Sequence, residues 1–349
     1  MSVSIAIAAE PEASAQVSPE ATLPGLLRLH ATRHPNAAAI VASTNAGAVR
    51  LGFAALDRLV DTVAENLSAL RLPAASGIAI PAHNRIETVV AMLAAMRADH
   101  TAVLLPPLWR EDEAAATLAA SGAVALVVTG ATASDVEVAR RLAAASFTIR
   151  FVCTLRKIAP DGLIALGAPR GATPQAPQSE ATAAALVTFD TLADGHHACT
   201  RTHRALLAGG MAVASEAGLR PHARIASTLL PTGFANITAT IVPWLVTGGT
   251  LELSDALAEA PRTGTSDADV TVLPGPLVVP FVEAGRLDAS RGVVLSVRRG
   301  GAGCAAPTAG RRPGPALTRA RARYLRIFGN LAAALRAWHA AGRRADEPD

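Results

Sequence analysis

The chain has 349 residues, half of them hydrophobic, and a formal net charge of +4 at pH 7. A chain of this length and composition can bury a large core, which excludes general disorder. Aromatic residues make up only 3% and the arginines are spread along the sequence, which argues against nucleic-acid binding. No apolar run reaches the roughly 18 residues that a membrane span needs.

Residues 1–20 are rich in Ala, Ser, Glu and Pro, which predicts a flexible tail. They lack the basic start of a signal peptide. The three cysteines, Cys153, Cys199 and Cys304, lie far apart and show no metal-ligand spacing. This usage indicates a reducing, cytoplasmic location without disulfides.

The first half alternates helices and strands. Apolar residues at helical spacing predict helices over 22–36, 52–72, 84–99 and 110–122. Short apolar runs predict strands over 37–43, 76–82, 101–107 and 123–130. This alternation is typical of a doubly wound α/β fold with a parallel sheet.

A Pro/Ala/Gln-rich loop near 167–181 separates this half from a second half, which also contains both helices and strands. There we predict helices over 202–218 and 237–249, and strands over 183–189, 224–230, 250–253, 269–275 and 292–298. A last helix is expected over 330–344.

The stretch "VTFDTLADGHHACTRTHRALL", residues 187–207, has the setting of a phosphate loop: an apolar strand, a small-residue turn and a helix. Such a loop needs glycines, hydroxyls and a lysine. This turn holds one glycine, Gly195, and the only lysine of the chain is Lys157. The pair His196–His197 has no acidic or cysteine partner at ligand spacing, so a solvated loop is favoured over a metal site.

Several segments together resemble the large N-terminal domain of the adenylate-forming superfamily, which includes acyl-CoA synthetases and adenylation domains. "LGFAALDRLVDTVAENLSAL", "MLAAMRADHTAVLLPP" and "FANITATIVPWLVTGGTLEL" match its characteristic segments in order. "LVTFDTLADGHHACTRTHRALL" stands where the family has T-S-G-T-T-G-x-P-K-G followed by T-H-R-x-L. "LSVRRGGAGCAAP" resembles its adenine-side glycine segment, and "LRIFGNLAAA" its Y-G-x-T-E motif.

The resemblance implies an α/β domain over residues 21–340, with a polar tail at 341–349. The resemblance also implies remnants of the family's nucleotide-binding site. They are Thr191, Gly195, His197, Thr202, Gly300, Gly301 and Gly329. It implies an acyl or aryl pocket lined by Phe234, Asn236 and Thr238, although a core role for Phe234 stays open. Ala235 replaces the aspartate of amino-acid-activating members. Thr202 is expected to cap the next helix, with His203 in a structural role.

The departures from the family pattern bear on activity. The lysine position carries His197 or a neighbour, and Asp190 and Asp194 add negative charge facing a triphosphate. Leu331 and Ala332 replace the Thr-Glu pair whose glutamate helps hold Mg²⁺. We find no counterpart of the family's ribose-binding aspartate, hinge and lid domain with its lysine.

Three hypotheses follow. The first is a member that has lost adenylation, with no catalytic residue and no metal ligand, but with a carboxylic-acid pocket or a partner-binding role. The second is an active acid ligase completed by a separate lid domain, with ATP, Mg²⁺ and CoA as the family cofactors. The third is a decaying gene product. Surface left apolar by a missing lid would favour a homodimer or a partner enzyme.

Overall fold

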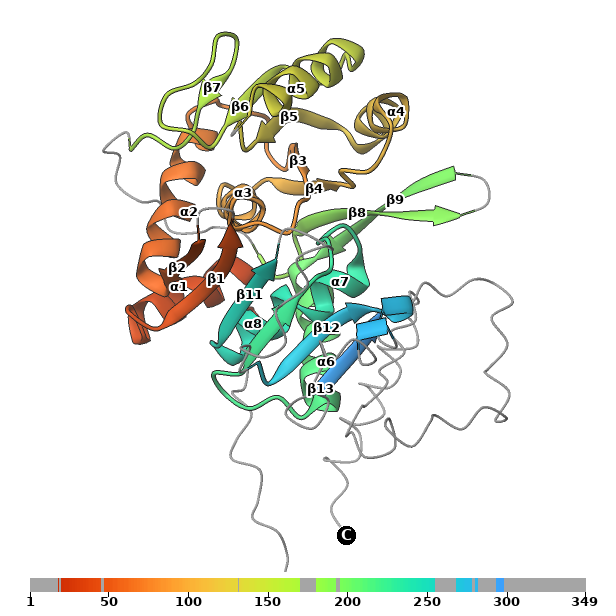
Figure 1. Ribbon diagram of the computed structural model, residues 1–349. Helices are drawn as coiled ribbons and strands as arrows, with labels where there is room; N and C mark the ends of the chain where they lie inside the picture. The colour runs from red at the N-terminus through yellow and green to blue at the C-terminus, as the bar shows by residue number, and fades with distance from the viewer. Residues whose placement is uncertain are drawn as a thin grey trace, which may run out of the picture.

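The computed structural model describes residues 18, 20–44, 47–130, 132–169, 180–192, 195–254, 268–277, 280–281 and 293–297. These residues form two β-sheets with helices around and between them (Figure 1). The predicted α/β class with mostly parallel sheets is confirmed. Gly300, Gly301, Gly329 and the predicted helix over 330–344 lie outside the described residues.

The larger sheet has seven strands in the order β7-β6-β5-β3-β4-β8-β9. All neighbours are parallel except β8 and β9, which form an antiparallel hairpin. The strands are β3 (Gly77–Pro81), β4 (Thr101–Leu105), β5 (Ala123–Val128), β6 (Phe151–Thr154), β7 (Ile164–Ala165), β8 (Ala184–Leu192) and β9 (Gly195–Thr202).

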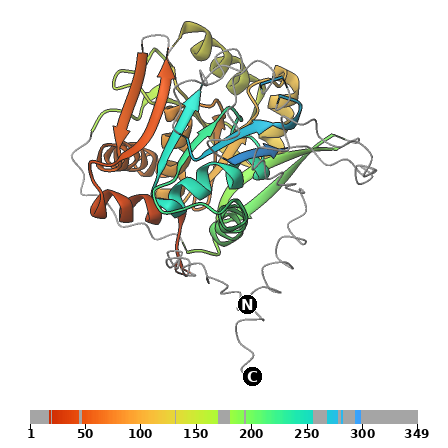
Figure 2. The ribbon, with the colours of Figure 1, turned by 60° about the horizontal axis from the view of Figure 1, so that its bottom comes forward.

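The second sheet has six strands in the order β13-β12-β10-β11-β1-β2, parallel except for the β1–β2 hairpin. The strands are β1 (Ala38–Thr44), β2 (Gly47–Gly52), β10 (Arg224–Ser227), β11 (Thr250–Ser254), β12 (Val270–Pro274) and β13 (Val293–Val297). Figure 2 shows the β1–β2 hairpin beside β11.

The two halves of the sequence exchange strands. β1, from the first half, pairs with β11, with Ile40 opposite Leu251. β8, from the second half, pairs with β4, with Val103 opposite Val187. Each sheet is therefore completed by the other half of the chain, and the hydrophobic core is shared between them.

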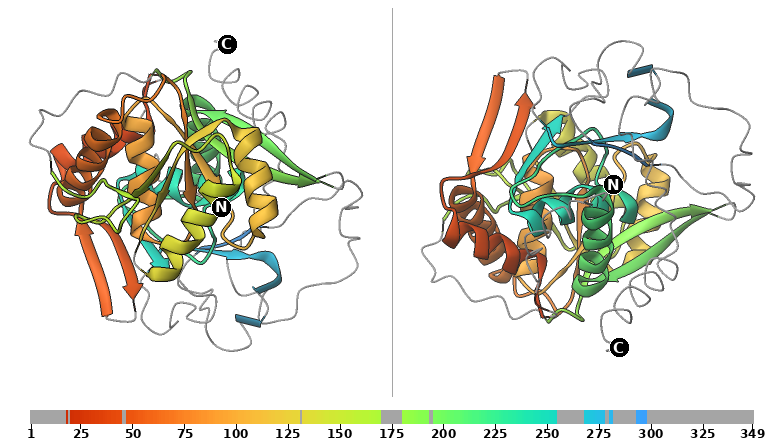
Figure 3. Two further views of the ribbon diagram at one scale, coloured as in Figure 1. Left: turned by 90° about the horizontal axis from the view of Figure 1, so that it is seen from above. Right: turned by 90° about the horizontal axis from the view of Figure 1, so that it is seen from below.

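The helices are α1 (Leu23–Arg33), α2 (Phe53–Ser68), α3 (Ile86–Arg97), α4 (Glu111–Ser121), α5 (Ala133–Ala145), α6 (His203–Ala217), α7 (Phe234–Ala239) and α8 (Ile241–Thr247), with a 3₁₀ turn η1 at Gly275–Leu277. Buried residues of α1, α2, α3, α6 and α8 join both sheets in one large core. Helices α4 and α5 build a smaller core on the other face of the seven-stranded sheet. Figure 3 shows α4 and α5 on one side of the molecule and α6 on the opposite side.

Two parts of the prediction were wrong in detail. The single helix expected over 237–249 is broken at Thr240 into α7 and α8. Pro243 explains the break, since proline lacks an N–H donor and its ring clashes with the carbonyl four residues earlier. Helix α5 and strands β2, β6, β7 and β9 were not predicted.

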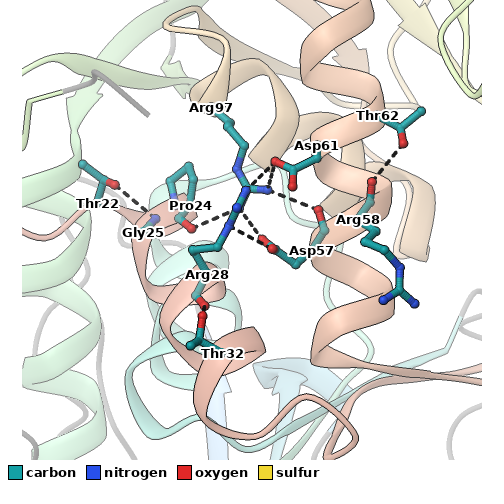
Figure 4. Close-up of polar contacts among 10 residues, drawn as sticks. All are labelled: Thr22, Pro24, Gly25, Arg28, Thr32, Asp57, Arg58, Asp61, Thr62 and Arg97. Carbon is teal, nitrogen blue, oxygen red and sulfur yellow. Dashed lines mark hydrogen bonds and ion pairs between the residues drawn. The ribbon is translucent and has the colours of Figure 1, made fainter. Parts of the chain in front are cut away.

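A buried ion-pair network joins the first three helices (Figure 4). The side chain of Arg97, at the end of α3, is only 2% exposed. Its guanidinium donates to the Asp57 carboxylate at 2.7 Å and to the Asp61 carboxylate at 2.8 Å, both on α2. It also donates to the backbone carbonyl of Pro24 on α1 at 3.2 Å. The more exposed Arg28 completes the network, with its Nε 2.9 Å from Asp57 Oδ2.

Candidate functional site

The segment predicted as a degenerate phosphate loop is a β-hairpin. Strands β8 and β9 stay paired up to Thr191 opposite His196 and Leu192 opposite Gly195. Only residues 193 and 194, which lie outside the described residues, connect them. The predicted small-residue turn between a strand and a helix is thus wrong, and so is the loop predicted for His196 and His197, because both histidines belong to β9. In Figure 1 the paired strands extend away from the body of the two sheets.

This geometry differs from that of a phosphate cradle. A cradle needs successive backbone N–H groups that converge on one anion. Successive N–H groups of an extended strand point in opposite directions, and every second one is used in the antiparallel ladder. The strand pairing through Thr191 and Gly195 therefore leaves little backbone around the tip that could surround a triphosphate.

Lys157 lies far from this hairpin. It follows β6, which is separated from β8 by β5, β3 and β4. Four strand spacings of about 4.8 Å amount to roughly 19 Å across the sheet. The side chain is exposed at the opposite edge, so it cannot serve as a phosphate-loop lysine.

The two histidines of the hairpin have different surroundings. His197 is exposed and stands opposite Asp190 in the strand register. His196 is partly buried and its ring lies 4.2 Å, centroid to centroid, from the ring of Trp109. Trp109 also contacts Phe189, at 5.2 Å. This aromatic contact between the hairpin and the segment before α4 was not predicted, and the alternation of side chains along a strand was its only signal.

Thr202 and His203 begin helix α6 as predicted. Thr202 Oγ1 accepts a hydrogen bond from the N–H of Ala205 at 3.2 Å, which is the geometry of an N-cap. His203 is 1% exposed, and its Nδ1 accepts a hydrogen bond from the N–H of Leu23 at 3.4 Å. Burial lowers the pKa of His203 to about 4, so the ring is neutral at physiological pH.

Replacing Thr202 with Ala should remove this cap and lower the free energy of unfolding by about 0.5–2 kcal/mol. Urea unfolding, followed by circular dichroism, measures the change. Thr200→Ala, at an exposed position of the same strand, is the matched control and should change stability little. Equal effects of the two substitutions would contradict a capping role.

The three residues predicted to line an acid pocket lie on one short helix, α7. Phe234 is buried and packs close to Gly209 of α6. The guanidinium of Arg201 lies over the Phe234 ring, 4.8 Å from the ring centroid. The hydroxyl of Thr238 donates to the backbone carbonyl of Phe234 at 2.9 Å. The amide of Asn236 donates to the carbonyl of Leu230 at 2.7 Å. Their pocket role stays a prediction.

Within the described residues, no group of three His, Cys, Asp or Glu side chains could hold a metal ion. Cys153 is buried and forms no disulfide, and burial raises its pKa to about 12. No helix in the described part of the chain is both long enough and apolar enough to span a membrane.

The fold has well-defined relatives. The chain resembles MbtA from Mycobacterium smegmatis (20% identity, TM-score 0.66), covering 80% of this chain and 53% of that one. It also resembles a fatty acyl CoA synthetase from Mycobacterium tuberculosis (18%, TM-score 0.66, covering 80% and 55%). A third similar structure is acetoacetyl-CoA synthetase from Streptomyces lividans (19%, TM-score 0.69, covering 80% and 47%). The chain therefore spans about half the length of these structures.

No curated protein matches the sequence. The sequence profile described as AMP-binding enzyme, in contrast, matches residues 27–311. This range contains most of the chain, including the β8–β9 hairpin and the α7 segment, and the structural relatives have the same fold. The chain belongs to the AMP-binding enzyme family, the adenylate-forming ligases.

Proposed function

We propose that this family member no longer carries out ATP-dependent adenylation and acts by binding a carboxylic acid or a partner protein. The observation that carries the proposal is the β8–β9 hairpin in the place of the phosphate loop. Its strands remain paired up to Leu192 and Gly195, and two residues connect them. A loop of that length offers few backbone donors to a triphosphate.

The charges around the hairpin support the same conclusion. Asp190 stands opposite His197 in the register, and Asp194 follows in the connection. Carboxylates repel a triphosphate, and losing one charge-assisted hydrogen bond to an ion costs roughly 1.5–3 kcal/mol. The lone lysine lies at the other edge of the sheet. The family's phosphate-loop lysine thus has no match in the hairpin.

An acid-binding role is suggested by the α7 segment and by the family. Phe234 and Thr238 pack against Gly209 of α6. The ligands of related structures are aryl and acyl compounds, such as anthranoyl-AMP in an anthranilate CoA ligase and 3-hydroxybenzoyl-AMSN in NpsA from Klebsiella oxytoca. We propose that the acid site, where it persists, is formed by Phe234, Asn236 and Thr238.

The alternative is an active carboxylic-acid ligase completed by a separate lid domain. Family membership over residues 27–311 favours it, together with relatives that are about twice as long as the matched part. Such an enzyme would use Mg-ATP, and CoA as acyl acceptor. A partner enzyme, a lid domain or a second copy of the chain would then cover part of the surface.

We expect millimolar Mg-ATP to leave the melting temperature unchanged. A ligand present at a hundred times its Kd stabilises the folded state by about 2.7 kcal/mol. For a chain of 349 residues each kcal/mol corresponds to roughly 1–2 °C, so an intact site would give a rise of about 3–5 °C. The measurement is a thermal melt with and without Mg-ATP.

AMP alone is the control, because it tests the adenine side without the triphosphate. ATP–pyrophosphate exchange across a panel of carboxylic acids is the second measurement, and we expect no exchange. An Mg-ATP-specific rise in melting temperature would instead put the ligase hypothesis first. Exchange that appears only with an added lid domain would support the same alternative.

A further inference from the structure

A cavity of about 220 Å³ lies away from the α7 segment, on the face of the seven-stranded sheet that α4 and α5 cover. Its apolar wall includes Leu105 and Val128, which end strands β4 and β5, and Ala114 and Leu142 from α4 and α5. None of Phe234, Asn236 and Thr238 lines it. It is therefore distinct from the proposed acid site.

The sheet topology explains why a cavity forms here. The chain runs from β3 to β4 on one side and then crosses back to β5 on the other side of β3. Consequently α3 packs on one face of the sheet, while α4 and α5 pack on the other. At such a reversal of strand order the connections diverge and leave a crevice at the carboxyl ends of the strands, where α/β proteins bind ligands.

Trp109 forms an aromatic wall of the cavity. Its ring is held by contacts with Phe189 of β8 and His196 of β9, at 5.2 and 4.2 Å between centroids. Aromatic residues are only 3% of the chain, so this cluster is a local concentration. A fixed indole ring is a good surface for stacking a planar ligand.

The polar side chains that line the cavity belong to His83, Glu111, Thr129 and Asp135. Asp135, at the start of α5, is partly buried and lines the wall. Thr129 donates to its Oδ2 at 2.9 Å and the N–H of Thr132 donates at 3.2 Å. Burial raises the pKa of this carboxyl, but the bonds from Thr129 and Thr132 and the charge of Arg85 outweigh it and lower the pKa, so Asp135 is ionised.

Glu111, at the start of α4, adds a second carboxylate at the mouth of the cavity. It is exposed and is paired with Arg141 at 2.7 Å, so its charge is largely balanced. Asp135 is therefore the less balanced of the two carboxylates, and the charge of Arg85 also acts on it. A ligand with a carboxylate or phosphate would meet this carboxylate in a partly buried place, whereas an ammonium group would pair with it.

We propose that this cavity binds a small aromatic amine, with the ring between Trp109 and the apolar wall and the ammonium group at Asp135. The size fits this class, since an apolar cavity of about 150 Å³ holds benzene. Cavities for drug-sized ligands are larger, about 300–1,000 Å³. The ligand would also contact the side chain that holds the β8–β9 hairpin.

The test compares three probes of similar size, phenethylamine, 2-phenylethanol and phenylacetate, by isothermal titration calorimetry and ligand-observed NMR on the full chain. We expect saturable binding of phenethylamine, at least about tenfold tighter than phenylacetate, since a charge-assisted hydrogen bond corresponds to about that factor or more. Absence of binding at millimolar phenethylamine, or equal affinity for the amine and the acid, would overturn the proposal.

Variants locate the site. Ala114→Leu fills the cavity and should abolish binding of phenethylamine, whereas Ala116→Leu, exposed on the same helix, should bind like the parent chain. Asp135→Asn keeps an acceptor for the α5 cap but removes the charge, so the affinity for phenethylamine should fall to that for 2-phenylethanol. If Ala114→Leu does not fold, the affinities of Asp135→Asn and of the parent chain for the three probes test the proposal instead. Unchanged binding in Asp135→Asn contradicts the assignment.

Discussion

Arg97→Met is expected to lower the free energy of unfolding by about 3–5 kcal/mol. The guanidinium of Arg97 is almost fully buried and pairs with Asp57 and Asp61 at 2.7 and 2.8 Å. Methionine fills a similar volume but leaves two largely buried carboxylates without their main cation. It also leaves the carbonyl of Pro24 without its donor. Chemical denaturation of the variant and the parent chain measures the difference.

Two further substitutions separate burial from charge in this prediction. Arg28→Met removes a second cation from the same carboxylates, but the Arg28 side chain is 38% exposed, so we expect a smaller loss. Arg141→Met breaks an exposed pair with Glu111 and should change the free energy of unfolding little. Adding Asp57→Asn to Arg97→Met should recover part of the lost stability. A loss for Arg97→Met no larger than that for Arg141→Met would contradict the argument.

The parts of the fold that could be predicted are those coded by local pattern. Strand β4 is a continuous apolar run and is fully buried between parallel neighbours, which is why its position was clear from the sequence. The cap at Thr202 was also readable, because the hydroxyl and the helix it starts are adjacent in sequence. Helix α5 has a similar local signal, since Thr132 and Asp135 form a capping box at its start.

The parts that could not be predicted depend on pairing over long distances in the sequence. The β8–β9 hairpin contains small and polar residues that favour a loop, and it becomes a ladder only through the register of Thr191 with His196. Strand β2 is exposed over most of its length and, among the described strands, pairs with β1 alone. No local pattern distinguishes such segments from turns, since their stability comes from the partner strand.

The candidate site shows the same division. The family resemblance placed Phe234, Asn236 and Thr238 on one segment, and the structure has them together on α7. The cavity at Trp109 and Asp135 joins the ends of strands that are tens of residues apart, so it could not be read from motifs. The cavity depends on the strand order β5-β3-β4, which no local sequence pattern encodes.

The last prediction concerns acid stability. A histidine that titrates near 6.5 in the unfolded chain and near 4 when folded takes up its proton first in the unfolded state. Above pH 6.5, His203 therefore does not reduce the free energy of unfolding. The free energy of unfolding decreases as the pH falls from 6.5 toward 4. Linkage over this interval gives a loss of about 2.5 kcal/mol at pH 4.5. Burial also lowers the pKa of His30 and His100, so these histidines also reduce stability as the pH falls.

His203→Gln keeps an acceptor for the N–H of Leu23 and cannot take up a proton. We expect it to be less stable than the parent chain at pH 7.5, because the new side chain packs less well, but to lose less stability on acidification. Urea unfolding at pH 7.5, 6.0 and 4.5 measures both slopes. His34→Gln, at an exposed histidine, is the control and should leave the slope nearly unchanged. Parallel slopes for the parent chain and His203→Gln would show that His203 takes up a proton while folded, and that its burial does not limit acid stability.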